Sequence, residues 1–364
     1  MVKEGIFGPT EAIILLTMST TARVFLPYPR FLAEIGGPAA WMTPLGGLVV
    51  ALIGVHVATL VLRKSPDKTI IEITEEALGP VLGMAFNIVT AMFFMAVAAL
   101  FTREFSEAMI IAALPSTPIS VIAFTFLFAG LLGAYLGIET MARSARLMYP
   151  YAIGGIIILL LALIPRWNVY NILPILGNGP LRVFGEGTFS TSGVTEIILA
   201  AVLVQAMGGV EKFRHIGFRS MIIAFLILIA LQLTLSLTFS WEVVTENTLP
   251  FYRLSRTIYL SRFFQRVEAL FIFIWSIIGA LKIALTLYGA SVTLSRALKL
   301  PDYRPLIWPL GLSVYILSFL PPDMPAAVKL DADFLSPFAL IPNYLLPLLL
   351  IIVFWLRRGK KNAG

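Results

Sequence analysis

The sequence predicts an all-α polytopic membrane protein, with ten transmembrane helices arranged as two inverted repeats of five. Three observations support this fold class. Of the 364 residues, 59% are hydrophobic. Only 13% are charged, about half of the roughly 25% that is usual in soluble domains. The chain also divides into ten apolar stretches whose spacing in the second half resembles that in the first. We expect residues 1–364 to form a single transmembrane domain.

Each predicted span approaches the roughly 20 apolar residues needed to cross a hydrocarbon layer of about 30 Å. Glycine, proline and charged residues separate the spans. The first span has no basic leader or small-residue cleavage site, so we expect it to be retained. The predicted spans are residues 10–35, 41–62, 80–113, 117–137, 145–164, 193–211, 219–241, 263–298, 305–320 and 335–356.

The two predicted repeats cover residues 10–165 and 193–356. Each span of the second repeat begins about 180 to 190 residues after its counterpart in the first. Because each half holds an odd number of spans, the second half must enter the membrane from the opposite side, which is typical of inverted-repeat transporters. Sixteen of the 27 Lys and Arg residues fall on the side of the N-terminus. This bias predicts that both termini are cytoplasmic.

Inverted-repeat transporters bind their substrates near the bilayer midplane, where the first span of each repeat is broken. In span 1, hydroxyl residues and Arg23 precede Pro27 and Pro29, which predicts an unwound segment. In span 6, a pair of glycines predicts the second break. A proline kink and a helix that simply ends at Gly-Gly are the alternatives. The predicted ligand-binding residues of the breaks are Thr20, Thr21, Ala22, Arg23 and Val24, and Gln205, Met207, Gly208 and Gly209.

Lys282 lies mid-way along span 8, with apolar residues for several turns on both sides. An ammonium at this depth is costly unless it faces a cavity or a partner. Two interpretations are open: a lysine that releases its proton and couples transport to protons, or a permanently charged lysine held by a carboxylate or by carbonyls in place of a bound cation. Arg23 is likewise either an interfacial anchor or a ligand for a substrate carboxylate.

Motifs for bond chemistry are absent from the sequence. There is no cysteine, and the two histidines, His56 and His215, have no acid within the eight residues that follow them. No zinc-binding pair at helical spacing and no glycine-rich phosphate loop occur. The basic residues lie between apolar blocks rather than on one face, which excludes a nucleic-acid-binding protein. We therefore expect neither an enzyme nor a bound metal or cofactor.

The chain resembles the B subunits of bacterial spore germinant receptors, which are permease-like members of the amino acid/polyamine/organocation superfamily. The order and spacing of several segments carry the resemblance: residues 25–41 (FLPYPRFLAEIGGPAAW), 73–83 (ITEEALGPVLG), 102–117 (TREFSEAMIIAALPST), 137–143 (GIETMAR), 171–179 (NILPILGNG), 266–275 (RVEALFIFIW) and 342–350 (PNYLLPLLL).

This resemblance implies the leucine-transporter-type fold and a subunit that senses a small nutrient such as an amino acid. It also implies A and C subunits as partners and a place in the inner membrane of the endospore. Faces of spans 3 and 8 would complete the pocket, with Phe94, Trp275 and Gly279 beside Lys282; packing is the alternative for Phe94. A proton-coupled amino-acid transporter of the same superfamily is the alternative function.

Overall fold

We analysed a computed structural model that describes residues 5–258 and 267–361. This part of the chain contains helices and connecting turns but no β-strand. Seven of its helical stretches are long and apolar enough to cross a membrane. They are Tyr28–Leu62, Pro80–Ala112, Ile119–Leu136, Ile138–Arg166, Val210–Thr238, Phe271–Ala297 and Met324–Arg357. The structure thus confirms an all-α polytopic protein.

Several predicted spans correspond to single helices. These are α3 (Thr43–Leu62), α5 (Pro80–Ala112), α6 (Ile119–Leu136), α7 (Ile138–Leu163), α10 (Val210–Thr238) and α13 (described over Val267–Ala297). The predicted start of span 8, residue 263, lies outside the described residues. Helices α1 (Pro9–Thr21), α9 (Glu196–Val202) and α14 (Arg304–Ser318) contain 13, 7 and 15 residues. Because each is shorter than a spanning helix, the number of ten spans stays a prediction.

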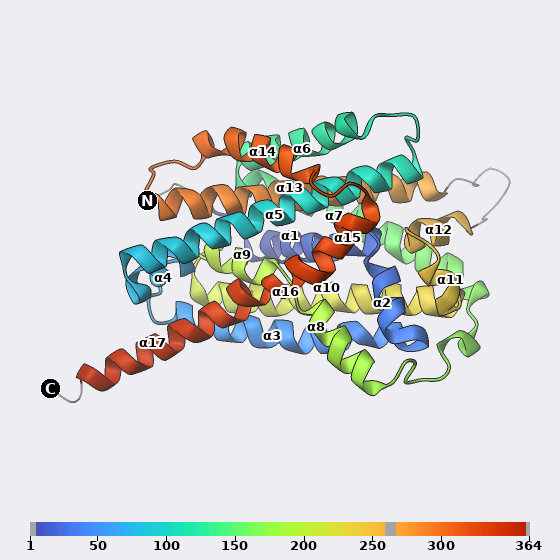
Figure 1. The fold of residues 1–364 in the computed structure, drawn as a ribbon, viewed down its shortest axis with the longest axis horizontal. Coiled ribbons are helices and arrows are strands. Elements are labelled where there is room, and N and C mark those ends of the chain that lie inside the picture. Colours follow the sequence, from blue (N-terminus) through green and yellow to red (C-terminus); the bar gives the residue numbers. More distant parts are fainter. Residues whose placement is uncertain (1–4, 259–266, 362–364) are drawn as a thin grey trace.

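The tenth span, predicted as residues 335–356, begins earlier, at Met324, and is assembled from several consecutive pieces. They are α15 (Met324–Leu330), the π-helical turn η6 (Asp331–Leu335), α16 (Ser336–Phe338), a second π-helical turn η7 (Ile341–Leu345) and α17 (Leu346–Lys361). Such interruptions leave backbone groups free for other partners, so they are tolerated in a membrane only where protein surrounds them. This segment crosses the front of the bundle in Figure 1.

Helix α13 forms the centre of the bundle, packed along α5 and α6. Its side chains Trp275, Lys282 and Tyr288 are fully buried. In the apolar stretch of α13, 67% of the residues are buried inside the protein, whereas in the stretch that contains α7 only 17% are buried. Helix α1 lies in the middle of the bundle, against α7 and α10 (Figure 1). The ammonium of Lys282 on α13 is therefore shielded from the surroundings by other helices.

Both ends of the described chain lie at one end of the bundle, near α4 (Ile70–Leu78) (Figure 1). The Phe7 amide donates to the Ala206 carbonyl, in the turn after α9. Arg357 of α17 donates to the carbonyls of Glu76 and Ala77 at 3.1 and 2.8 Å. At the opposite end lie α2 (Tyr28–Gly36), α11 (Trp241–Thr245) and α12 (Pro250–Arg256). The bundle thus has one end that holds the termini and one end that lies away from them.

Candidate functional site at the two helix breaks

The predicted break in span 1 is present. Helix α1 ends at Thr21, and a 3-10 turn, η1 (Ala22–Phe25), leads to an extended Leu26. The Thr20 and Thr21 hydroxyls donate back to the carbonyls of Leu16 and Thr17 at 2.9 and 3.0 Å. Such bonds compete with the backbone ladder, and proline at 27 and 29 has no N–H to continue it. The chain therefore restarts as α2 at Tyr28.

The break in span 6 lies at residues 192–195, not at Gln205–Gly209 as the sequence predicted. A first arm, formed by the π-helical turn η5 (Arg182–Glu186) and α8 (Gly187–Thr191), precedes it, and α9 follows. The predicted sixth span starts only at residue 193 and therefore leaves out this first arm. Gly208 and Gly209, with φ of +86° and +95°, form the turn between α9 and α10. Helix α9 ends at Val202, six residues before Gly208, so the glycine pair lies in the connection between two helices and not at a break within the sixth span.

Asn343 of η7 spans the break in the sixth span. Its side-chain oxygen accepts from the Ile198 N–H at 3.0 Å, and its side-chain nitrogen donates to the Val194 carbonyl at 2.9 Å. In a continuous helix these two backbone groups, four residues apart, would bond to each other. The asparagine thus takes the place of a helical hydrogen bond and satisfies both groups. Tyr344 adds a bond from its hydroxyl to the Ser192 carbonyl at 3.0 Å.

Lys282 and Glu196 form a buried ion pair between the two breaks. The lysine Nζ lies 2.5 Å from Oε1 of Glu196, and each side chain is 1% exposed. The Ser19 hydroxyl, near the end of α1, donates to the same oxygen at 2.5 Å. The lysine ammonium also lies 4.9 Å from the centre of the Phe101 ring. One charge pair therefore connects α1, α5, α9 and α13, each of which contributes a side chain.

Arg23 connects the two breaks directly. Its guanidinium Nη2 donates to the Gly193 carbonyl at 2.9 Å, and its Cζ lies 5.1 Å from the Tyr28 ring centre. Gly193 fits closely here: a Cβ on it would lie 2.9 Å from the Ser336 carbonyl oxygen. Arg23 therefore supplies a donor to backbone that the second break leaves without a helical partner.

Beside Arg23 lies a narrow chamber of about 30 Å³. Residues of α2, α5, α8 and the tenth span line it, among them Tyr28, Phe101, Glu104, Ser190 and Asp331. Glu104 is 5% exposed. It interacts electrostatically with Asp331 and Arg23. The chamber therefore places two carboxylates next to the first break.

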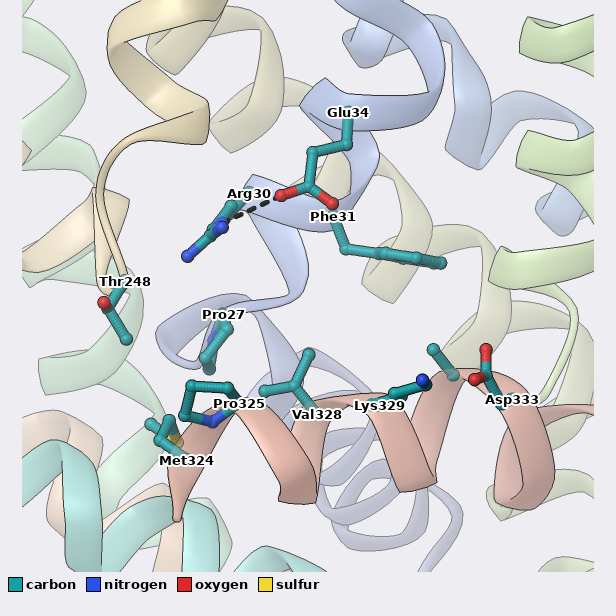
Figure 2. Close-up of a pocket in the computed structure, with 11 residues that line it drawn as sticks. Pro27, Arg30, Phe31, Glu34, Thr248, Met324, Pro325, Val328, Lys329 and Asp333 are labelled. Carbon is teal, nitrogen blue, oxygen red and sulfur yellow. Dashed lines mark hydrogen bonds and ion pairs between the residues drawn. The ribbon is translucent and has the colours of Figure 1, made fainter.

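A larger cavity of about 280 Å³ adjoins this chamber (Figure 2). The two share Pro27, Phe31, Val328 and Ala332 in their walls. Figure 2 shows α2 on one side, with the Arg30–Glu34 ion pair of 2.9 Å, and the α15 segment on the other. The cavity therefore lies at the end of the bundle away from the termini.

The other predicted site residues fall into two groups. Trp275 and Gly279 lie near Lys282 against Phe105: the two aromatic ring centres are 5.8 Å apart, and a Cβ on Gly279 would lie 2.6 Å from Phe105 Cε1. Ala22 and Val24 are buried in η1. These residues surround the breaks.

The second group lies away from the breaks. Phe94 packs at the interface of α5 and α13, since a Cβ on Gly289 would lie 3.5 Å from its ring. Gln205 donates to the Pro66 carbonyl at 2.9 Å and fixes the loop that follows α3. Met207 is buried in the same turn as Gly208 and Gly209. The structure does not bring these residues together with Lys282.

Four residues of this region were not among the predicted site residues: Glu104, Glu196, Asp331 and Asn343. Glu196 had a signal, because it is an isolated carboxylate in an apolar stretch, as Lys282 is an isolated ammonium. Glu104 stands beside Arg103 and three residues before Glu107, a pattern typical of structural ion pairs or gates. The structure pairs Arg103 with Glu107 at 2.7 Å and leaves Glu104 facing the chamber.

Comparison with known proteins places this geometry in a family. The family model described as "Spore germination protein" matches residues 8–325. The chain is 24% identical to spore germination protein KB of Bacillus subtilis (strain 168), over 91% of this chain and 90% of that protein. It is 27% identical to spore germination protein YndE of the same organism, over 98% of this chain and 100% of that protein.

Solved structures identify the fold. MhsT in complex with L-phenylalanine superposes with a TM-score of 0.62 at 11% identity, covering 97% of this chain and 99% of that one. MHP1, a nucleobase-cation-symport-1 family transporter in a closed conformation with bromovinylhydantoin bound, gives a TM-score of 0.65 at 12% identity, over 93% and 78%. Both have the leucine-transporter-type fold that the sequence predicted.

This family and this fold are those of receptors and transporters rather than enzymes. With seven long apolar helical stretches in the part that the structure describes, the chain is a multi-pass membrane protein. The family model covers most of its length, and both relatives align over nearly the whole chain. The chain therefore belongs to the spore germination protein family.

Proposed function

We propose that this protein is the nutrient-sensing, permease-like B subunit of a spore germinant receptor. It binds a small molecule, with an amino acid as the first candidate, between the broken first and sixth spans. The inner membrane of the endospore is its proposed location, with both termini cytoplasmic. A and C subunits are its proposed partners. The family match and the relatives support the role, and the leucine-transporter-type fold supports the location of the site.

The observation that carries the proposal is the fully buried Lys282–Glu196 pair between the two breaks. A buried ion pair is expensive to form and gives little net stability. Its position between helix ends that leave backbone groups without helical partners is typical of a ligand site in this fold. Of the two interpretations of Lys282, the carboxylate partner favours a lysine that stays charged and fixes the geometry of the breaks.

Ligand-binding residues are proposed accordingly. Arg23 and the η1 residues line one side, residues 192–195 line the other, and Trp275, Gly279 and Lys282 form the floor. Met207, Gly208, Gly209 and Gln205 lie at the far end of α9, so we propose that they act through the shape of that helix. Proton-coupled amino-acid transport is the second candidate, because both structural neighbours are transporters of small molecules.

The test uses spores that lack their own copy of this gene and carry a variant instead. With the unsubstituted protein, a panel of amino acids and other nutrients should trigger loss of optical density. Lys282→Met should abolish that response while immunoblots still detect the protein. The matched control is Lys64→Met, at an exposed lysine in the turn after α3 that lines neither cavity, which should respond normally. Normal germination of the Lys282 variant would contradict the proposed site.

Transport is tested separately in proteoliposomes. Uptake of a labelled amino acid that depends on an imposed proton gradient would favour the transporter. Germination without any such uptake across the same panel would favour a receptor that binds its ligand and does not move it.

A further inference from the structure

The narrow chamber beside the breaks contains a carboxylate that has no partner. Glu104 is 5% exposed and lines the chamber. Within residues 5–258 and 267–361, no hydrogen bond or ion pair reaches its carboxylate; it interacts only at longer range with Asp331 and Arg23. Burying an ionised carboxylate without a partner is costly. A carboxyl group buried in this way is stabilised by a proton or by a cationic group placed beside it.

The neighbouring cations are already engaged. Arg103 precedes Glu104 in the chain, but its guanidinium binds Glu107 and the Pro322 carbonyl, both at 2.7 Å. Lys282 binds Glu196. The Arg23 guanidinium donates to the Gly193 carbonyl and lies against the Tyr28 ring. None of these three cations therefore satisfies Glu104.

The charges around the breaks do not balance. Three carboxylates face two cations, if Arg103 and Glu107 are set aside as a neutral pair. In addition, Oε2 of Glu196 has no hydrogen-bond partner among the described residues. The rim of the outer cavity adds two cations, Arg30 and Lys329, and two carboxylates, Glu34 and Asp333. The excess of one negative charge therefore stays the same. One added positive charge would balance the set of Glu104, Glu196, Asp331, Arg23 and Lys282.

The space has two compartments. The chamber, with a volume of about 30 Å³, has room for one or two groups of the size of a water molecule. An ammonium group is of this size. The adjoining cavity of about 280 Å³ is walled by Pro27, Phe31, Met324, Pro325 and Val328. These apolar walls suit the organic body of a ligand, and the polar and charged side chains of Thr248, Arg30, Glu34, Lys329 and Asp333 complete the lining.

We propose that Glu104, with Asp331, binds the protonated primary amine of a small organic ligand whose body occupies the outer cavity. This inference rests on the proposed function and specifies the charge of its ligand. Charge balance favours a ligand with one net positive charge over a zwitterion. Arg23 then orders the breaks through Gly193 and does not hold a ligand carboxylate.

The first experiment needs no substitution. The purified protein in detergent is titrated with amino-acid amides from glycinamide to phenylalaninamide, and binding is measured by thermal shift and calorimetry. Two matched series remove the charge: the N-acetylated amides, and the carboxamides that lack the amino group. At least one amide should bind, and its uncharged counterparts should bind about 30-fold or more weakly, because a buried charge would lose its partner.

The second experiment locates the site. Glu104→Gln keeps the size of the side chain and removes its charge, so the affinity for the best amide should fall about 30-fold or more. Glu211→Gln is the matched control, since Glu211 of α10 is exposed and lines neither cavity, and the affinity of this variant should be unchanged. If Glu104→Gln fails to fold, the comparison of charged and uncharged ligands on the unsubstituted protein still decides.

Three results would overturn the inference. One is equal affinity for charged and uncharged ligands. Another is an affinity for the amide that Glu104→Gln leaves unchanged. The third is stabilisation by sodium or potassium over choline that Glu104→Gln removes, which would assign the chamber to an inorganic cation. A spore that germinates equally well with a nutrient lacking an amine refutes this inference alone, whereas a spore that responds to no nutrient refutes the proposed function as well.

Discussion

The ammonium of Lys282 lies 2.5 Å from a carboxylate oxygen of Glu196, a residue 86 positions earlier in the chain. One partner follows the second helix break, and the other lies on the central helix α13. Both are sealed from solvent. A pair in this position holds the end of a short helix against the core of the bundle. It also gives the site a fixed internal dipole.

Breaking this pair should destabilise the protein more than removing it entirely. Lys282→Met or Glu196→Gln alone leaves an uncompensated buried charge, at a cost of about 3 to 5 kcal/mol. The double variant leaves none, so much of the loss should be recovered. Apparent melting temperatures in detergent measure the three variants.

The control for this cycle is Arg30→Met, which breaks the half-exposed Arg30–Glu34 pair. That change should cost less than about 1 kcal/mol. Additive losses in the double variant would show that Lys282 and Glu196 do not depend on each other.

Asn343→Leu should loosen the break in the sixth span. The Ile198 N–H would lose its partner, at about 1 to 3 kcal/mol for a buried group. The Val194 carbonyl would keep only the longer bond from the Ile197 N–H, at 3.4 Å. The melting temperature should fall clearly, whereas Ser313→Ala, at an exposed hydroxyl that bonds within its own helix, should leave it unchanged. An unaltered melting temperature for Asn343→Leu would mean that the helix closes its own ladder.

Gly279→Ala tests the close approach of α13 and α5. The new Cβ would lie 2.6 Å from Phe105 Cε1, so the two helices must separate. Overpacking of this kind typically costs about 1 to 3 kcal/mol. The additional substitution Phe105→Leu should restore part of the loss.

Gly154→Ala on α7 is the matched control, because a Cβ there meets no atom within 4 Å. Alanine is the better helix former, so this variant should be neutral or more stable by roughly 0.5 to 1 kcal/mol. If both alanine variants behave alike, the contact with Phe105 does not limit the packing.

Membrane topology can be tested directly, because the natural chain has no cysteine. Ser65→Cys lies in the turn after α3, and Asn171→Cys lies in η4 (Val169–Ile172), which follows α7. An impermeant thiol reagent should label Cys at 171 on intact cells and at 65 only after permeabilisation. The opposite pattern would reverse the predicted orientation. Labelling of both on intact cells would contradict the spans between them.

The sequence predicts the first break better than the second for a physical reason. The hydroxyls at 19–21 and the prolines at 27 and 29 disrupt helix locally, so their effect can be read from neighbouring residues. The second break depends on Asn343, about 150 residues away, and on the fit of Gly193 against Ser336. The Gly208–Gly209 pair is the stronger local signal, but it closes a helix rather than opening one.

The same distinction applies to the charges. Lys282 is conspicuous in an apolar stretch, but its partner follows only from the three-dimensional fold. Glu104 was obscured by its neighbours in the sequence. Helical periodicity pairs Arg103 with Glu107, four residues on, and turns Glu104 towards a different face.

Asn343 also connects the break to the far end of the molecule. It lies in η7, which continues without a loop into α17, and Arg357 of that helix holds two carbonyls of α4. The 14 residues between Asn343 and Arg357 span about 21 Å as helix. A ligand that shifts Asn343 would therefore also move α17, whose far end is hydrogen-bonded to α4. Ligand binding at the break would then displace α4 at the opposite end of the bundle. Another protein chain that contacts α4 could respond to this displacement although no ligand had crossed the membrane.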